Sequence, residues 1–131
     1  MIIQKLHLKK YDWRIVILYQ VTYEHLTYIL KILDEMQADR KSVIAATNNI
    51  SANLPNTGFI YSNYEDRQSL IVIGKATSAE QLLNTISHEV NHLEEHIGKV
   101  CNVEANSEEA CHLVGYVMQR MGAVFKKIIC K

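Results

Sequence analysis

Four consecutive apolar residues at positions 70–73, Leu-Ile-Val-Ile, constrain the fold of this chain most strongly. Three of the four are β-branched, and β-branched side chains favour strands over helices. A strand that is apolar on both of its faces is typical of a strand buried on both sides. The pattern therefore predicts a buried strand over residues 68–75.

The remaining hydrophobic pattern alternates between the strand period of two and the helix period of 3.6 residues. It predicts two strands at residues 2–8 and 13–21, joined by a turn at 9–12, and a further strand at 59–62. Helices are expected at 26–36 and 40–52, the second capped by Asp39, then from a capping box at Thr77 to Gly98, and again after the cap Ser107. This order predicts a single α+β domain over residues 1–131, with a small antiparallel sheet packed on helices.

Composition excludes several classes of function. The chain has 131 residues, 48% of them hydrophobic, which is enough for one core. Lys and Arg number 14 and Asp and Glu also number 14, so no basic surplus favours binding to nucleic acid. No apolar run approaches the length of a membrane span, and the N-terminus lacks the pattern of a signal peptide. The three cysteines, Cys101, Cys111 and Cys130, are expected to be reduced thiols. We therefore expect a cytoplasmic protein.

The segment His88-Glu89-Val90-Asn91-His92 fits the metal-binding pattern H-E-x-x-H. Residues four apart on a helix lie one turn apart on the same face, so both imidazoles can reach one Zn²⁺ at about 2.1 Å. Glu89 then faces the metal-bound water rather than the metal.

Two histidines need a third protein ligand, and the next predicted helix opens with Glu108 and Glu109. Glu108 is preferred because it shares a helix side with the small residues Cys111, Gly115 and Gly122, which would permit close approach to a neighbouring helix. Glu109 remains open as the alternative ligand, whereas Glu104 falls in a loop. His96 lies about 12 Å along the helix axis from His88, too far to share a metal with it.

These motifs together resemble the core of the zincin metallopeptidases, in the gluzincin subgroup whose third ligand is a glutamate. Residues 107–116 also resemble the second-helix segment of small zincin-like proteins from bacteriophages and mobile elements of gut bacteria. The resemblance implies Zn²⁺ held by His88, His92 and Glu108, with Glu89 as the general base for a zinc-activated water that attacks a peptide amide. His112 and Tyr116 are auxiliary candidates for stabilising the oxyanion.

The chain departs from two zincin patterns. The longer motif H-E-x-x-H-x-x-G-x-x-H is absent because Gly98 stands where its last histidine belongs, and no N-E-x-x-S-D segment follows. A zincin-like interaction protein of a mobile element, without catalysis, is therefore an alternative.

A di-iron carboxylate protein is a weaker alternative. Glu89-x-x-His92 and Glu109-x-x-His112 are two E-x-x-H pairs on successive helices, a spacing that builds di-iron sites in four-helix bundles. Glu24 or Glu35 would then supply the further carboxylates.

Overall fold

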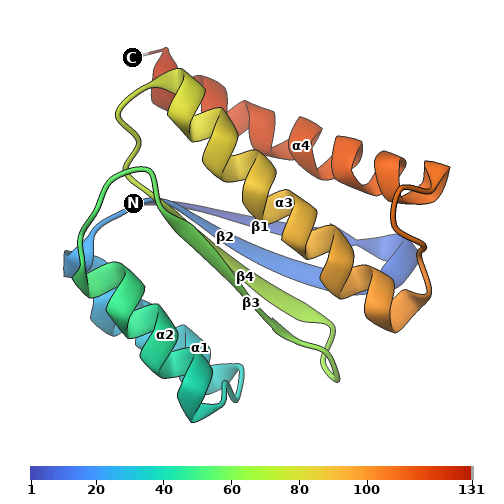
Figure 1. The fold of residues 1–131 in the computed structure, drawn as a ribbon, viewed down its shortest axis with the longest axis horizontal. Coiled ribbons are helices and arrows are strands. Elements are labelled where there is room, and N and C mark those ends of the chain that lie inside the picture. Colours follow the sequence, from blue (N-terminus) through green and yellow to red (C-terminus); the bar gives the residue numbers. More distant parts are fainter. Residues whose placement is uncertain (131) are drawn as a thin grey trace.

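The computed structural model describes residues 1–130 and has a four-stranded sheet at its centre (Figure 1). The strands are β1 (Ile2–Leu8), β2 (Trp13–Val21), β3 (Gly58–Asn63) and β4 (Gln68–Gly74), and their order across the sheet is β1-β2-β4-β3. β1 pairs with β2 and β3 pairs with β4 in antiparallel fashion, whereas β2 and β4 are parallel. Short 3₁₀ turns, η1 (Lys9–Tyr11) and η2 (Tyr23–His25), follow β1 and β2.

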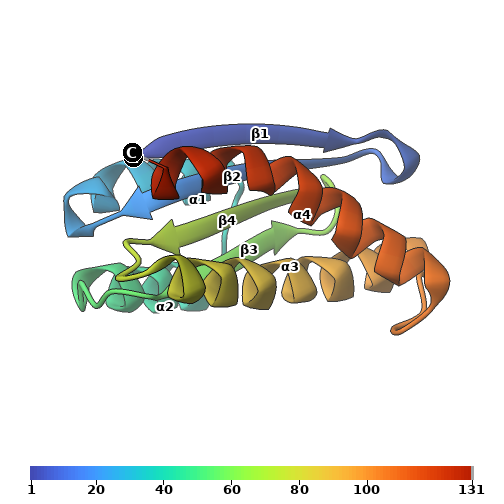
Figure 2. The ribbon, with the colours of Figure 1, turned by 90° about the horizontal axis from the view of Figure 1, so that it is seen from above.

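Helices cover both faces of this sheet. On one face lie α1 (Leu26–Glu35) and α2 (Arg40–Ser51), and on the other lie α3 (Ala79–Cys101) and α4 (Glu108–Ile129) (Figure 1). α3 packs on β3, β4 and α4, and Figure 2 shows it running alongside β3 while α4 lies toward β2 and β1. Within residues 1–130, no helix is both long and apolar enough to cross a membrane.

The apolar run in β4 explains this layered arrangement. Leu70 and Val72 belong to the core cluster shared with α1 and α2, whereas Ile71 and Ile73 belong to the cluster shared with α3 and α4. All four side chains are at most 2% exposed. The buried strand predicted from the sequence is thus confirmed, and it needs a helical layer on each side.

The predicted α+β class and the packing of a small sheet on helices are confirmed, but the sheet is mixed rather than wholly antiparallel. The chain leaves β2, forms α1 and α2 on one face, and returns through β3 to place β4 beside β2 in the same direction. Such a parallel neighbour requires a long crossover, which the two helices provide. The sequence pattern predicts the strands at 13–21 and 68–75 but carries no signal for their pairing.

The predicted helix ends need two corrections. Ser78, not Thr77, caps α3, since its hydroxyl accepts a hydrogen bond from the backbone N–H of Gln81 at 3.1 Å. α3 also continues past Gly98 to Cys101, and its C-cap residue Asn102 adopts the left-handed conformation with φ 57°. Asn tolerates that conformation and can replace the expected glycine at a helix end. Ser107 caps α4 as predicted.

Gly58 allows α3 to lie close to the edge strand. A Cβ atom at this position would lie 2.9 Å from the carbonyl oxygen of Val72, 3.0 Å from the Cγ2 atom of Thr85 and 3.3 Å from the Cγ atom of Glu89. Because two of these atoms belong to α3, any side chain at Gly58 pushes the helix off the sheet. The spacing between β3 and α3 therefore depends on the missing side chain.

We predict that Gly58→Ala lowers the free energy of unfolding by about 1–3 kcal/mol, the usual cost of overpacking. Gly115 is the matched control, because a Cβ there would meet nothing within 4 Å in the middle of α4. Gly115→Ala should raise the free energy of unfolding by about 0.5–1 kcal/mol through helix propensity. Urea denaturation of both variants measures the two effects, and equal effects would contradict the close packing at Gly58.

Candidate metal centre

His88 and His92 form a preassembled pair on α3. Their Nε2 atoms lie 3.2 Å apart, and their rings meet edge to face at a centroid distance of 4.7 Å. Two nitrogens bound to one tetrahedral zinc at about 2.1 Å would lie about 3.4 Å apart. The pair therefore has the spacing to hold one metal ion with almost no movement.

The second nitrogen of the His92 ring has an acidic neighbour. Its Nδ1 atom lies 4.0 Å from a carboxylate oxygen of Glu95, one turn further along α3. This separation is too long for a hydrogen bond, and the two side chains are 43% and 60% exposed, so the contact is weak. The Nε2 atom is the nitrogen of the His92 ring that faces His88.

Glu89 lies beneath the pair and is almost completely buried. Its side chain packs against the edge strand at Gly58 and is 4% exposed. Within the described residues it makes no hydrogen bond and no ion pair through its carboxyl group. Burial raises the pKa of Glu89, and the neighbouring His88 and His92 oppose that rise. No fully buried side-chain oxygen in the described chain lacks a hydrogen-bond partner, so the carboxyl oxygens of Glu89 keep contact with solvent through the cavity although the residue as a whole is 4% exposed. A largely buried carboxyl with a raised pKa in a cavity marks a candidate functional group.

A cavity of about 360 Å³ opens above these residues, between α3 and β3. Its walls are the first residues of β3 and the α3 residues His88, Glu89, His92 and His96. His88 and Glu89 also line a neighbouring hollow of about 290 Å³ with Asn49, Asn56 and Asn84 among its walls. His88 and Glu89 therefore stand where two hollows meet at the edge of the sheet, and His92 lines the larger of the two.

A buried hydrogen-bond chain ends at His96 in the same cavity. The Trp13 indole donates to the Ser69 hydroxyl at 2.9 Å, the hydroxyls of Ser69 and Ser62 lie 2.6 Å apart, and the Ser62 hydroxyl lies 2.6 Å from the Nδ1 atom of His96. An indole can only donate, and both hydroxyl protons find an acceptor within this chain of bonds only when it runs from Trp13 through Ser69 and Ser62 to Nδ1 as the final acceptor. Neutral His96 then carries its proton on Nε2.

Sequence reasoning missed the role of His96, because the residue lies too far from His88 to share its metal. Burial lowers the pKa of His96, and the positive charges of Lys99 and His92 lower it further, against a smaller opposing effect of Glu95. The imidazole is therefore neutral near pH 7. A signal was present, since Ser62 and Ser69 interrupt two apolar strands, and the structure pairs these two positions across the β3–β4 hairpin.

The structure does not bring Glu108 to the histidine pair. Its carboxylate lies 3.3 Å from Nε2 of His112, and the two side chains are 88% and 78% exposed. A Cβ atom added to Gly115 or Gly122, on the same side of α4, would meet nothing within 4 Å, so this side faces solvent rather than α3. α4 also begins beside the C-terminal end of α3, on the side away from β3 (Figure 2).

Glu109 and Tyr116 also lie elsewhere. Glu109 accepts a hydrogen bond from the Tyr11 hydroxyl at 2.8 Å and forms an ion pair with Lys10 at 3.1 Å, while the Tyr116 hydroxyl accepts a hydrogen bond from Arg120 at 3.0 Å. Within residues 1–130, no group of three or more His, Cys, Asp or Glu side chains is arranged to hold a metal ion. The described chain thus presents two of the three expected ligands.

The geometry also disfavours the di-iron alternative. Glu89 faces β3, whereas Glu109 faces η1, so the two E-x-x-H pairs do not converge. Glu24 in η2 and Glu35 in α1 lie with the helices of the opposite face of the sheet. A mixed sheet occupies the space that a four-helix bundle would use for its metal site.

Comparison of the chain with known protein families, with curated proteins and with solved structures finds no match.

We predict that acidification below pH 6.5 destabilises the protein through His96. The folded state resists protonation of this buried imidazole while the unfolded state binds the proton from the ordinary pKa of 6.5 downward, so stability falls as the pH falls through this window. His96→Asn should abolish this component. Urea denaturation of both proteins at pH 7.5 and pH 5.5 measures it, and an equal loss of stability in the two proteins would contradict the buried neutral imidazole.

Proposed function

We propose that this protein is a zinc-dependent hydrolase of peptides, with His88 and His92 as metal ligands and Glu89 as the general base. The observation that carries the proposal is the largely buried residue Glu89, 4% exposed and with no protein hydrogen-bond partner for its carboxyl group, beside two histidines whose Nε2 atoms lie 3.2 Å apart. Perturbed, buried titratable groups in a cleft are typical of catalytic sites.

Zinc bound to the pair would supply a Lewis acid and would lower the pKa of a water molecule to about 7. Glu89 would then carry out the proton transfers of amide hydrolysis. Because burial raises its pKa, its carboxylate is a stronger base than that of an exposed glutamate. The same carboxyl can take a proton from water and pass it to the leaving nitrogen of an amide.

The position of His96 suits it to stabilise the carbonyl oxygen of the substrate. Its Nδ1 atom is occupied by Ser62, and its ring lines the cavity that contains Glu89 and His92. The neutral ring therefore has an Nε2–H to donate, and a fixed donor near the reacting carbonyl stabilises developing negative charge. We assign His96 the role first considered for His112 and Tyr116.

The substrate class follows from the edge strand. β3 is the last strand of the sheet, so one of its sides has no strand partner, and its residues Phe59 and Ile60 line the cavity of the histidine pair. An extended peptide can add to such an edge through main-chain hydrogen bonds. It would then run past Glu89 and His96.

The absence of a third ligand among the described residues favours one second candidate. Catalytic zinc sites ordinarily have three protein ligands and one open position. With two ligands, zinc is held less tightly. A zincin-like interaction protein that binds metal without turnover would have the same two-ligand site. The two candidates differ in whether Glu89 acts on a substrate.

We predict that the purified protein binds one zinc ion per chain, and that His88→Ala and His92→Ala each abolish the binding. Glu89→Gln should retain zinc and lose about 10²–10⁴-fold in the rate of peptide hydrolysis, the usual contribution of a general base. Plasma mass spectrometry and isothermal titration measure the metal, and a library of quenched fluorescent peptides measures hydrolysis.

Glu108→Gln is the matched control, because this exposed carboxylate lies on α4 away from the pair and should leave zinc affinity unchanged. Failure of the unmodified chain to bind zinc would overturn the hydrolase and would favour the interaction protein, without a metal. Zinc binding without hydrolysis of any library peptide would favour the interaction protein.

A further inference from the structure

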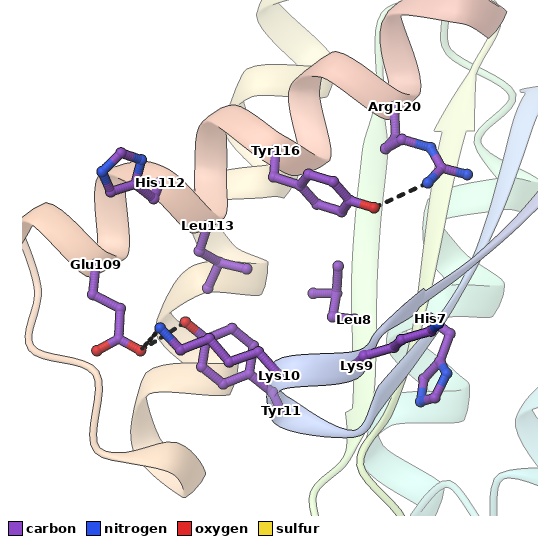
Figure 3. Close-up of a pocket in the computed structure, with 10 residues that line it drawn as sticks. All are labelled: His7, Leu8, Lys9, Lys10, Tyr11, Glu109, His112, Leu113, Tyr116 and Arg120. Atoms are coloured by element: carbon purple, nitrogen blue, oxygen red, sulfur yellow. Dashed lines mark hydrogen bonds and ion pairs between the residues drawn. The ribbon is translucent and has the colours of Figure 1, made fainter.

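A second cavity, of about 650 Å³, lies between η1 and α4, outside the site proposed above (Figure 3). The hairpin residues that join β1 to β2 form one wall, and successive turns of α4 form the other. Its volume is that of a typical small-molecule site. None of its lining residues belongs to the histidine cavity at β3.

The inner surface of this cavity is apolar and aromatic. Leu8 and Leu113 are each 5% exposed, and the rings of Tyr11 and Tyr116 flank them. Figure 3 shows Tyr116 on α4 and Tyr11 on η1 on opposite sides of the two leucines. A flat apolar group could lie on the leucines between the two tyrosine rings, since aromatic groups pack favourably edge to face or offset.

The two ends of the cavity differ in charge. At one end the hydrogen bond from Tyr11 and the ion pair with Lys10 hold the pKa of Glu109 low. Burial and the hydrogen bond to Glu109 raise the pKa of Tyr11 to about 12. The charge at this end is therefore already neutralised. Figure 3 shows Lys10 directed toward Glu109 and Lys9 directed away from it.

At the other end two cations have no carboxylate partner among residues 1–130. Arg120 contacts the Tyr116 hydroxyl at 3.0 Å, and Lys9 makes no ion pair in the same part of the chain. Arg120 lies eleven residues, or about 16 Å of helix, beyond Glu109. This end also holds His7, whose Nε2 atom lies 2.9 Å from the Asp12 carboxylate, so Arg120 and Lys9 are the lining cations there that have no carboxylate partner of their own.

We propose that this cavity binds a small aromatic anion. Its ring lies on Leu8 and Leu113 between the tyrosines, and its phosphate or carboxylate group is held by Arg120 and Lys9. A guanidinium matches the geometry of both oxyanions through paired N–H donors, and the lysine adds a mobile point charge. The apolar surface selects for the aromatic part and the two cations select for its charge.

Phenyl phosphate is the probe, titrated into the ¹⁵N-labelled chain while amide NMR shifts are recorded at low salt. We expect saturable shifts at residues 8–11 and 113–120, with weaker binding of inorganic phosphate and of uncharged benzyl alcohol. Arg120→Gln and Lys9→Gln should each weaken binding about tenfold, the loss expected for one charge-assisted hydrogen bond.

Lys126→Gln is the matched control, because Lys126 is an exposed cation of the same helix that does not line the cavity. It should leave the affinity for phenyl phosphate unchanged, and the thermal unfolding midpoint verifies that each variant is folded. Equal binding of inorganic phosphate, or equal weakening by all three substitutions, would overturn the proposal in favour of general surface charge. Absence of shifts at the lining residues would overturn it as well.

Discussion

The burial of β4 on both faces is the constraint on which the rest of this structure depends. Leu70 and Val72 can be removed from water only by α1 and α2, and Ile71 and Ile73 only by α3 and α4. Burial of each such side chain contributes about 1.5–3 kcal/mol, so neither helical layer is dispensable. With β2 on one side and β3 on the other, β4 also fixes the edge strand against which α3 must pack.

That packing places the candidate metal centre. Because Gly58 has no side chain, α3 approaches β3 closely enough to bury Thr85 and Glu89, and the helical spacing then sets His88 and His92 at the rim of the contact. The carboxyl of Glu89 has no hydrogen-bond partner in the protein and keeps only the solvent contact that the cavity allows, and this partial loss of hydration carries a free-energy cost. An apolar residue at position 89 would pack there without that cost. The contact between α3 and β3 thus sets a partly dehydrated carboxyl beside two imidazoles at chelating distance, and the proposed function rests on this combination.

The sequence predicted those features that depend on local spacing. The α3 helix and the proximity of His88 to His92 follow from residues at most four apart, and the predicted cap of α3 was wrong by one residue. Residues 13–21 have the pattern of an alternating strand, but Leu18 is also buried, because β2 is a central strand covered on both faces. The prediction that Glu108 is the third metal ligand depended on the small residues on its side of α4, but that side faces solvent. The pattern of one helix indicates which side differs from the others, but not which neighbour it meets. The chain from Trp13 to His96 joins three strands and a helix, so no local pattern could predict it.

Both proposed sites lie where a helix passes over the margin of the sheet. The centre of each layer must be filled with apolar side chains to near-crystalline density, which leaves no room for a ligand there. At the margins the covering is incomplete, at β3 beneath α3 and at η1 beneath α4. Polar and charged side chains can remain there at the cost of small losses of packing. Substitutions of exposed side chains at the two margins, such as Lys9 and Arg120, should therefore change binding with little effect on folding, whereas substitutions in β4 should do the reverse. Glu89, like the buried cavity residues Leu8 and Leu113, contributes both to packing and to a site, and its replacement by glutamine tests chemistry while preserving volume.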